Sequence, residues 1–114
     1  MKGVREVDLK SDWPTAAEAL RRLETEVARA RRDRVRALKL IHGYGSTGVG
    51  GAIRQAVRAW LDRQGKARRL KAVVPGEEWS IFDAPSRQLL EACPDLARDP
   101  DLENYNPGIT FVLL

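Results

Sequence analysis

The chain has 114 residues, one cysteine and a formal net charge of +4. This length suits a single domain, and one cysteine excludes an internal disulfide. No run approaches the roughly 20 apolar residues of a membrane-spanning helix, and the charged residues 1–13 lack the apolar core of a signal peptide. We therefore expect one soluble, cytoplasmic domain over residues 1–114.

Charge is distributed unevenly along the chain. Residues 1–71 carry 18 Lys or Arg against 8 Asp or Glu, a net charge of +10, whereas residues 72–114 carry 2 against 8, a net charge of −6. A basic surface built from the first part favours a polyanionic partner. The clusters ARARRDRVR and KARRLK follow predicted helices, where basic residues also favour the helix dipole. The sequence leaves open whether these clusters extend a nucleic-acid footprint.

The chain begins with a predicted strand, helix and strand. Residues 4–9 alternate in polarity, as a half-buried strand does. Thr15 and Glu18 form a capping box that begins an amphipathic helix over residues 15–32. Residues 35–41 are mostly apolar and predict the second strand.

A glycine-rich segment then leads into a second helix. Apolar residues at helical spacing predict this helix over residues 50–64, and Gly65 lies where a C-terminal glycine is expected. The remaining predicted elements are a strand over 70–74, a short helix over 84–93 and an apolar strand over 109–114.

Helix-linked strands favour parallel pairing with right-handed crossovers. We therefore expect a small two-layer α/β sandwich with about four mostly parallel strands and two main helices, in the order β-α-β-α-β-α-β. Residues 76–106 are interpreted as an insertion before the last strand. The sequence leaves open the oligomeric state, and whether the last strand is an exposed edge that pairs with another chain.

The segment HGYGSTGVGGAIR, residues 42–54, follows a strand and opens a helix. Glycines let the backbone come close to a ligand, and amides at a helix N-terminus favour an anion such as phosphate. The triphosphate loop is excluded, because no lysine follows a glycine here. Residues 43–48 match G-x-G-x-x-G, but the acidic residue and the chain length of a dinucleotide fold are missing.

A third match is more specific. His42-Gly43-x-Gly45, followed by a glycine pair and Ala52-Ile53-Arg54, resembles the HGxGxGxLR motif of the Smr family, the small MutS-related domain. The VDL of residues 7–9 resembles the start of that family's LDLHG motif, and GITFV at residues 108–112 resembles its last strand. The resemblance implies binding of RNA or DNA and, in some members, DNA nicking or RNA cleavage, including action on stalled ribosomes. The ribosome is therefore an open candidate partner.

Two departures from the family pattern bear on function. Lys10 and Ser11 replace the histidine and glycine of LDLHG, and about four extra residues separate Gly45 from Arg54, so that Gly51 keeps the motif's spacing. Binding is therefore the main hypothesis, because the basic loop and helix remain while a motif histidine is lost. The predicted phosphate-binding or nucleic-acid-binding residues are Lys10, Lys39, Gly43, Tyr44, Gly45, Gly51, Arg54 and Arg58.

The first alternative is an endonuclease that uses Asp8 and His42, facing each other across adjacent strand ends, with or without a divalent cation such as magnesium. His42 can instead cap its strand and donate to a loop carbonyl. No cluster has metal-ligand spacing. A second alternative is a protein-interaction module whose acidic segment, residues 77–106, docks a partner. Trp13 and Tyr44 can stack on bases or serve only as structural residues.

Overall fold

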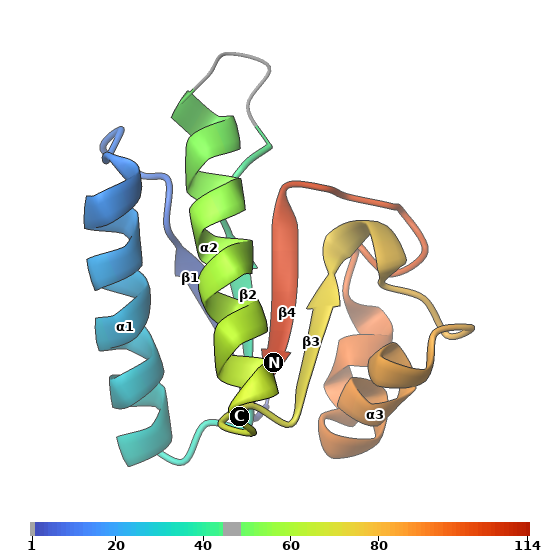
Figure 1. Cartoon of the computed structure of the whole chain (residues 1–114). Helices are drawn as coiled ribbons and strands as arrows, with labels where there is room; N and C mark the ends of the chain where they lie inside the picture. Colours follow the sequence, from blue (N-terminus) through green and yellow to red (C-terminus); the bar gives the residue numbers. More distant parts are fainter. Residues whose placement is uncertain (1, 45–48) are drawn as a thin grey trace.

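The computed structural model describes residues 2–44 and 49–114, which fold around one four-stranded sheet. Its order is β1-β2-β4-β3 (Figure 1). The strands are β1 (Val4–Asp8), β2 (Ala37–Ile41), β3 (Ala72–Pro75) and β4 (Ile109–Leu113). β1 pairs with β2 in parallel, whereas β4 is antiparallel to both β2 and β3. The sheet is mixed, so the prediction of mostly parallel strands is wrong.

The connection between β3 and β4 explains this difference. It leaves the C-terminal end of β3 through the 3-10 helix η1 (Gly76–Glu78), passes through α3 (Ala84–Ala92) and η2 (Pro94–Arg98), and returns to the same end of the sheet, where β4 starts. A connection that starts and finishes at the same end of the strands produces antiparallel pairing, whereas a crossover to the opposite end produces parallel pairing. The element order also differs from the predicted one by the two 3-10 helices.

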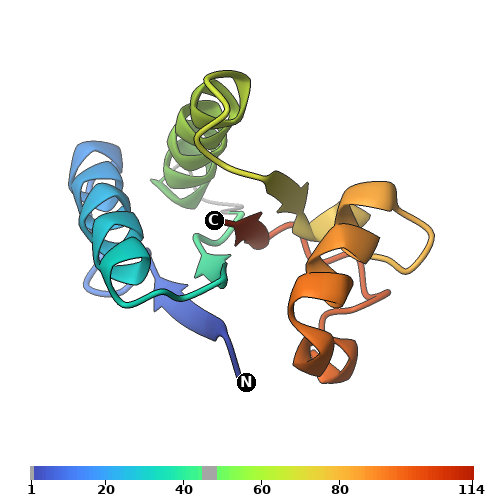
Figure 2. The same cartoon turned by 90° about the horizontal axis from the view of Figure 1, so that it is seen from below.

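Helices cover both faces of the sheet. α1 (Ala16–Arg32) and α2 (Val49–Lys66) lie on one face, and α3 lies on the other (Figure 2). The described residues thus form three layers with three α-helices, so the predicted two-layer sandwich with two main helices needs correction. The third layer exists because residues 79–96 bury a second apolar cluster, which the acidic composition of that segment obscures.

The two faces of the sheet bury separate cores. Alternation along β2 sends Leu38 and Leu40 toward α1 and α2, and Ala37 toward α3. On the α3 face, Trp79 stacks on Phe111 with 4.3 Å between ring centroids. β4 is buried along its whole length because it lies inside the sheet, so it is not an exposed edge.

The helix ends follow the predictions in part. Thr15 and Glu18 form the expected capping box at the start of α1. The prediction for Gly65 is wrong, because α2 continues to Lys66 and the left-handed backbone position belongs to Arg68, with φ 58°. Within residues 2–44 and 49–114, no helix is long and apolar enough to cross a membrane.

Candidate functional site

The segments that follow β1, β2 and β3 share one edge of the sheet with the start of β4 and the N-terminus of α2. The backbone N–H groups of His42 and Gly43 both donate to the carbonyl oxygen of Gly108, at 3.0 Å each. Gly43 has φ +73°, a left-handed conformation that glycine adopts without strain. The start of the glycine-rich loop is therefore anchored to the start of β4.

His42, the first residue after β2, is completely buried. Its Nδ1 lies 2.6 Å from the Gly43 carbonyl oxygen, which can only accept, so Nδ1 carries the proton. Nε2 then accepts from the Thr110 hydroxyl at 2.8 Å, and that hydroxyl oxygen accepts from Arg58 Nε at 3.3 Å. His42 thus donates to a loop carbonyl, as the second interpretation of this residue expected.

The surroundings of His42 keep it neutral at pH 7. Burial lowers the pKa of His42 to about 4, and the nearby positive charges of Arg58 and Arg54 act in the same direction. Its basic lone pair, on Nε2, is occupied by the Thr110 hydroxyl. In this state the imidazole cannot take a proton from a bound ligand.

Arg54 and Arg58 of α2 both bind the carboxylate of Glu77. Glu77 Oε2 lies 2.8 Å from Arg54 Nη2 and 2.8 Å from Arg58 Nη1, and Oε1 lies 2.6 Å from Arg58 Nη2. The hydrogen bonds from Arg58, followed by its charge and the bond from Arg54, outweigh desolvation and lower the pKa of Glu77 to about 2. Two predicted phosphate ligands are therefore already engaged by an internal anion.

Sequence reasoning missed Glu77 as part of this site. The available signal was its position directly after the third strand, at the edge where the other predicted ligands converge. Its neighbour Gly76 must be glycine, because a Cβ there would overlap the carbonyl oxygen of Asn106 and the side chain of Ile109. This tight turn sets where Glu77 meets the arginines.

The structure does not bring Asp8 and His42 together. Asp8 is paired in register with Ile41, which packs toward α3, so the next residue, His42, projects from the opposite face. Asp8 is exposed, and its Oδ1 accepts from the backbone N–H groups of Lys10 at 2.9 Å and Ser11 at 3.1 Å. No three His, Cys, Asp or Glu residues in the described ranges gather as a metal site.

Lys39 also lies away from the glycine-rich loop. It is buried on the α3 face, where its Nζ is 2.9 Å from Asp99 Oδ2 and 2.6 Å from Asp101 Oδ2. Burial disfavours its charge, but the two carboxylates outweigh this effect and raise the pKa of Lys39. Its side chain joins β2 to the segment before β4 instead of meeting the loop.

Lys10 and Tyr44 remain accessible beside the loop. A Cβ placed on Gly43 would lie 3.4 Å from Lys10 Cδ, and one on Gly108 would lie 3.4 Å from Tyr44 Cδ1. Tyr44 is 58% exposed and Trp13, after β1, is 87% exposed. Gly51 lies in the first turn of α2, and Gly45 lies outside the described residues.

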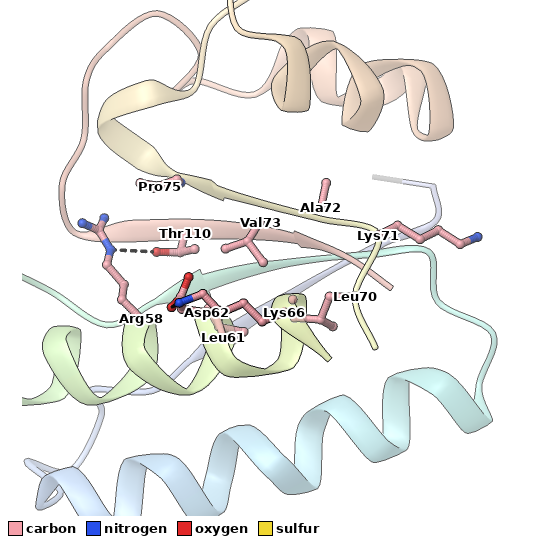
Figure 3. Close-up of a pocket in the computed structure, with 11 residues that line it drawn as sticks. Arg58, Leu61, Asp62, Lys66, Leu70, Lys71, Ala72, Val73, Pro75 and Thr110 are labelled. Atoms are coloured by element: carbon pink, nitrogen blue, oxygen red, sulfur yellow. Dashed lines mark hydrogen bonds and ion pairs between the residues drawn. The ribbon is translucent and has the colours of Figure 1, made fainter. Parts of the chain in front are cut away.

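A groove of about 530 Å³ runs between α2 and β3 (Figure 3). The Arg58–Thr110 hydrogen bond lies at one end of it, and Leu61, Leu70 and Val73 contribute apolar walls. The groove therefore reaches Arg58 and Thr110, the two residues that follow His42 in the hydrogen-bond chain, while His42 itself is completely buried.

Comparison with known proteins agrees with this architecture. The family model of the Smr domain matches residues 7–79. The crystal structure of the Smr domain of Thermus thermophilus MutS2 is similar, with 27% sequence identity, a TM-score of 0.59 and coverage of 96% of each chain. No curated protein matches the chain. Because the family model spans more than half of the sequence, this protein belongs to the Smr domain family, and the resemblance noted in the sequence is confirmed.

Proposed function

We propose that this Smr domain binds RNA or DNA at the loop edge, the surface formed by Lys10, Trp13, Gly43, Tyr44 and the N-terminus of α2. The observation that supports the proposal is the position of Lys10, whose exposed side chain lies next to Gly43, since its Cδ is 3.4 Å from where a Cβ on Gly43 would be. Helix N-terminal amides and a lysine together suit a phosphate group. Lys10 thereby supplies a phosphate contact where the family motif has a histidine.

Exposed aromatic residues supply the second part of the proposed interface. Trp13, Tyr44 and Tyr105 lie after β1, after β2 and just before β4, so they share this end of the sheet. Trp13 and Tyr105 have φ of 51° and 53°, a backbone conformation that bulky residues rarely adopt. Exposed, strained aromatics favour a binding role, because successive bases can stack on them.

Arg54 and Arg58 take a different role in this proposal. Their fork-like contact with Glu77 has the geometry that arginine also forms with phosphate. A phosphate would have to displace Glu77 to reach them. We therefore assign the first contact to Lys10 and the amides at the N-terminus of α2, and treat the two arginines as positioning residues that hold α2 against η1.

Cleavage by Asp8 and His42 is not part of the proposal. A general base must be accessible and within reach of the proton it removes. His42 is buried with its lone pair occupied, and Asp8 lies on the other face of the sheet. We expect binding to RNA or DNA without turnover by this pair. Neither the preference between RNA and DNA nor the ribosome as a partner enters the proposal.

The experiment measures binding of a fluorescent 20-nucleotide RNA and its DNA equivalent to the wild type, Lys10→Gln and Tyr44→Ala. Stacking on one aromatic contributes about 1–3 kcal/mol, so Tyr44→Ala should weaken binding roughly 5- to 150-fold. Arg98→Gln and Phe82→Ala are matched controls on the α3 side, and both should bind normally. Unchanged affinity in both loop-edge variants would show the proposed surface to be wrong.

The same samples report cleavage, with and without magnesium. Intact RNA and DNA after incubation with the wild type would agree with the proposal. Cleavage by the wild type that disappears in His42→Ala, while binding persists, would instead support the endonuclease.

One observation favours the protein-interaction alternative. Ile81 and Phe82, between η1 and α3, are 49% and 83% exposed. Large apolar side chains on such a loop suit a protein partner. Loss of a bound protein in Phe82→Ser, with unchanged nucleic-acid affinity, would assign this loop a separate role.

A further inference from the structure

The end of the domain opposite the loop edge is strongly basic. α1 and α2 run in the same direction, so their C-terminal ends lie together there (Figure 1). The Arg31 guanidinium donates to the carbonyl oxygen of Arg69 and ties these two ends to each other. We call this surface the basic pole. Its exposed cationic residues are Arg29, Arg31, Arg32, Arg34, Arg36, Arg63, Lys66, Arg68, Arg69 and Lys71.

Few of these charges are neutralised. The ion pairs at this end join Arg29 to Glu26, Arg32 to Asp33 and Lys66 to Asp62. In the part of the chain that the structure describes, no carboxylate lies within 4.0 Å of the other seven cations, which are Arg31, Arg34, Arg36, Arg63, Arg68, Arg69 and Lys71. The basic pole therefore carries a net field that attracts anions.

The backbone supplies an independent observation. At the end of α1, Val35 N–H donates to Ala30 O at 2.9 Å and Arg34 N–H donates to Arg31 O at 3.1 Å. This pair of bonds is a Schellman motif, in which glycine strongly predominates at the left-handed position. Arg34 takes that position here, with φ 58°.

α2 ends in the same way. Arg69 N–H donates to Gln64 O and Arg68 N–H donates to Gly65 O, at 3.0 Å each, and Arg68 also has φ 58°. Gly65 lies three residues too early to relieve the strain. Two neighbouring helix ends thus hold an exposed arginine where glycine would be more stable. Because both left-handed arginines lie on one surface and both lower the stability of the fold, we expect this surface to have a function.

The chemistry of the pole selects the partner. The exposed large apolar residues of the described chain are Trp13, Tyr44, Ile81, Phe82 and Tyr105, and none belongs to this surface. Protein interfaces and membrane-binding helices need such residues, whereas a nucleic-acid backbone does not. Six of the seven unpaired cations are arginine, which binds phosphate through two parallel hydrogen bonds.

We propose that the basic pole is a second nucleic-acid contact, which holds the sugar–phosphate backbone without stacking on bases. α1 and α2 contain 17 and 18 residues. At 1.5 Å per residue, the pole lies about 25 Å from the loop edge. One nucleic acid must therefore be on the order of seven or more nucleotides long to contact both surfaces, given about 3.4 Å per nucleotide along a helical strand. This inference rests on the proposed function only in taking nucleic acid as the ligand.

The test uses Arg34→Gly/Arg68→Gly, because this double variant removes two charges from positions that glycine suits. We expect a melting temperature equal to or above that of the wild type, so lost binding cannot result from unfolding. On a 20-nucleotide strand, the slope of log affinity against log salt should fall by about 1.4, at roughly 0.7 per lost phosphate contact. On a strand of 4 nucleotides bound at the loop edge, binding should not change.

Matched variants distinguish an effect of lost charge from an effect of altered side-chain shape, and binding at the basic pole from binding at the loop edge. Arg34→Lys/Arg68→Lys should keep the salt slope, and Arg87→Gln/Arg98→Gln, with the same loss of charge on the α3 side, should also keep it. An unchanged slope in Arg34→Gly/Arg68→Gly would overturn the inference. If Lys10→Gln and Tyr44→Ala both bind normally while this double variant does not, the loop-edge proposal fails and the basic pole stands. The reverse result rejects only the basic pole.

Discussion

His42 offers the sharpest physical test of the site, because it is the single histidine of the chain. Its imidazole signals in an NMR spectrum therefore need no assignment. We expect a titration midpoint near pH 4, since burial lowers the pKa of His42 to about 4 from an ordinary 6.5. We also expect the proton on Nδ1 in the neutral ring, because Nδ1 faces the Gly43 carbonyl.

The same shift predicts a pH-dependent stability. The unfolded chain binds a proton to His42 below about pH 6.5, whereas the folded chain resists it until about pH 4. The contribution is therefore fully present above pH 6.5 and is lost as pH falls to 4. At 1.36 kcal/mol per pKa unit, it amounts to about 3 kcal/mol of unfolding free energy.

Urea unfolding of the wild type and His42→Asn at several pH values between 7 and 4 measures this contribution. The wild type should lose more stability than the variant across that range. Thr110→Val removes the hydroxyl that donates to Nε2 and leaves that buried nitrogen without a partner, so it should lower the free energy of unfolding by about 1–3 kcal/mol. A midpoint between pH 6 and 7, a proton on Nε2, or identical pH dependence in wild type and His42→Asn would refute the reasoning.

Three further predictions concern the contacts that shape the site. Glu77→Gln should lower the unfolding free energy at pH 7 by about 1–2 kcal/mol, after allowance for partial exposure, with Glu78→Gln as a control. Because the pKa of Glu77 is lowered to about 2, the difference in unfolding free energy between the wild type and Glu77→Gln is present above pH 4.5 and shrinks toward pH 2. Equal differences at pH 7 and pH 2.5 would contradict this prediction. Gly76→Ala should lower the unfolding free energy by about 2–3 kcal/mol, because the added Cβ overlaps Ile109. Gly65→Ala has open space around its Cβ, so it should raise the unfolding free energy by about 0.5–1 kcal/mol, as measured in thermal melts. Lys39→Met should lower the unfolding free energy by about 3–5 kcal/mol in chemical unfolding, because the Asp99 carboxylate stays buried without its cation. An unchanged unfolding free energy would contradict the ion pair.

The Glu77 cluster also bears on the proposed binding. Glu77→Gln removes the internal anion from two arginines, so it should leave nucleic-acid affinity equal or higher while it weakens the fold. Loss of affinity in this variant would mean that Glu77 shapes the loop edge directly. Measuring stability and affinity on the same samples therefore separates these two roles.

Local sequence signals located most of the structural elements. The capping box of Thr15 and Glu18 marked the start of α1, and the alternation of residues 4–9 marked β1, because these signals depend only on near neighbours. The HGxG segment identified the family for the same reason. Gly43 has a positive φ, a local backbone conformation that favours glycine, so the glycine is visible in the sequence itself.

Contacts between distant residues were not accessible in this way. Periodicity does not report where in the sheet a strand inserts, so the sequence left open whether β4 is an edge strand and predicted mostly parallel pairing, whereas β4 lies between β2 and β3 and is antiparallel to both. The partners of Lys39 lie about 60 residues along the chain, in a segment interpreted as an insertion. The register of β1 against β2 set Asp8 and His42 on opposite faces, since one residue of offset reverses the side chain's direction.

The sequence by itself thus determined the secondary structure, the Smr family and the uneven charge of this protein. The tertiary structure decided which of those charges remain available. Glu77 forms ion pairs with Arg54 and Arg58, and Asp99 forms an ion pair with Lys39. Lys10 at the loop edge, and Arg34 and Arg68 at the basic pole, stay exposed. The physical reason is that a charge is neutralised by what folding brings within a few ångströms of it, and chain distance says little about that.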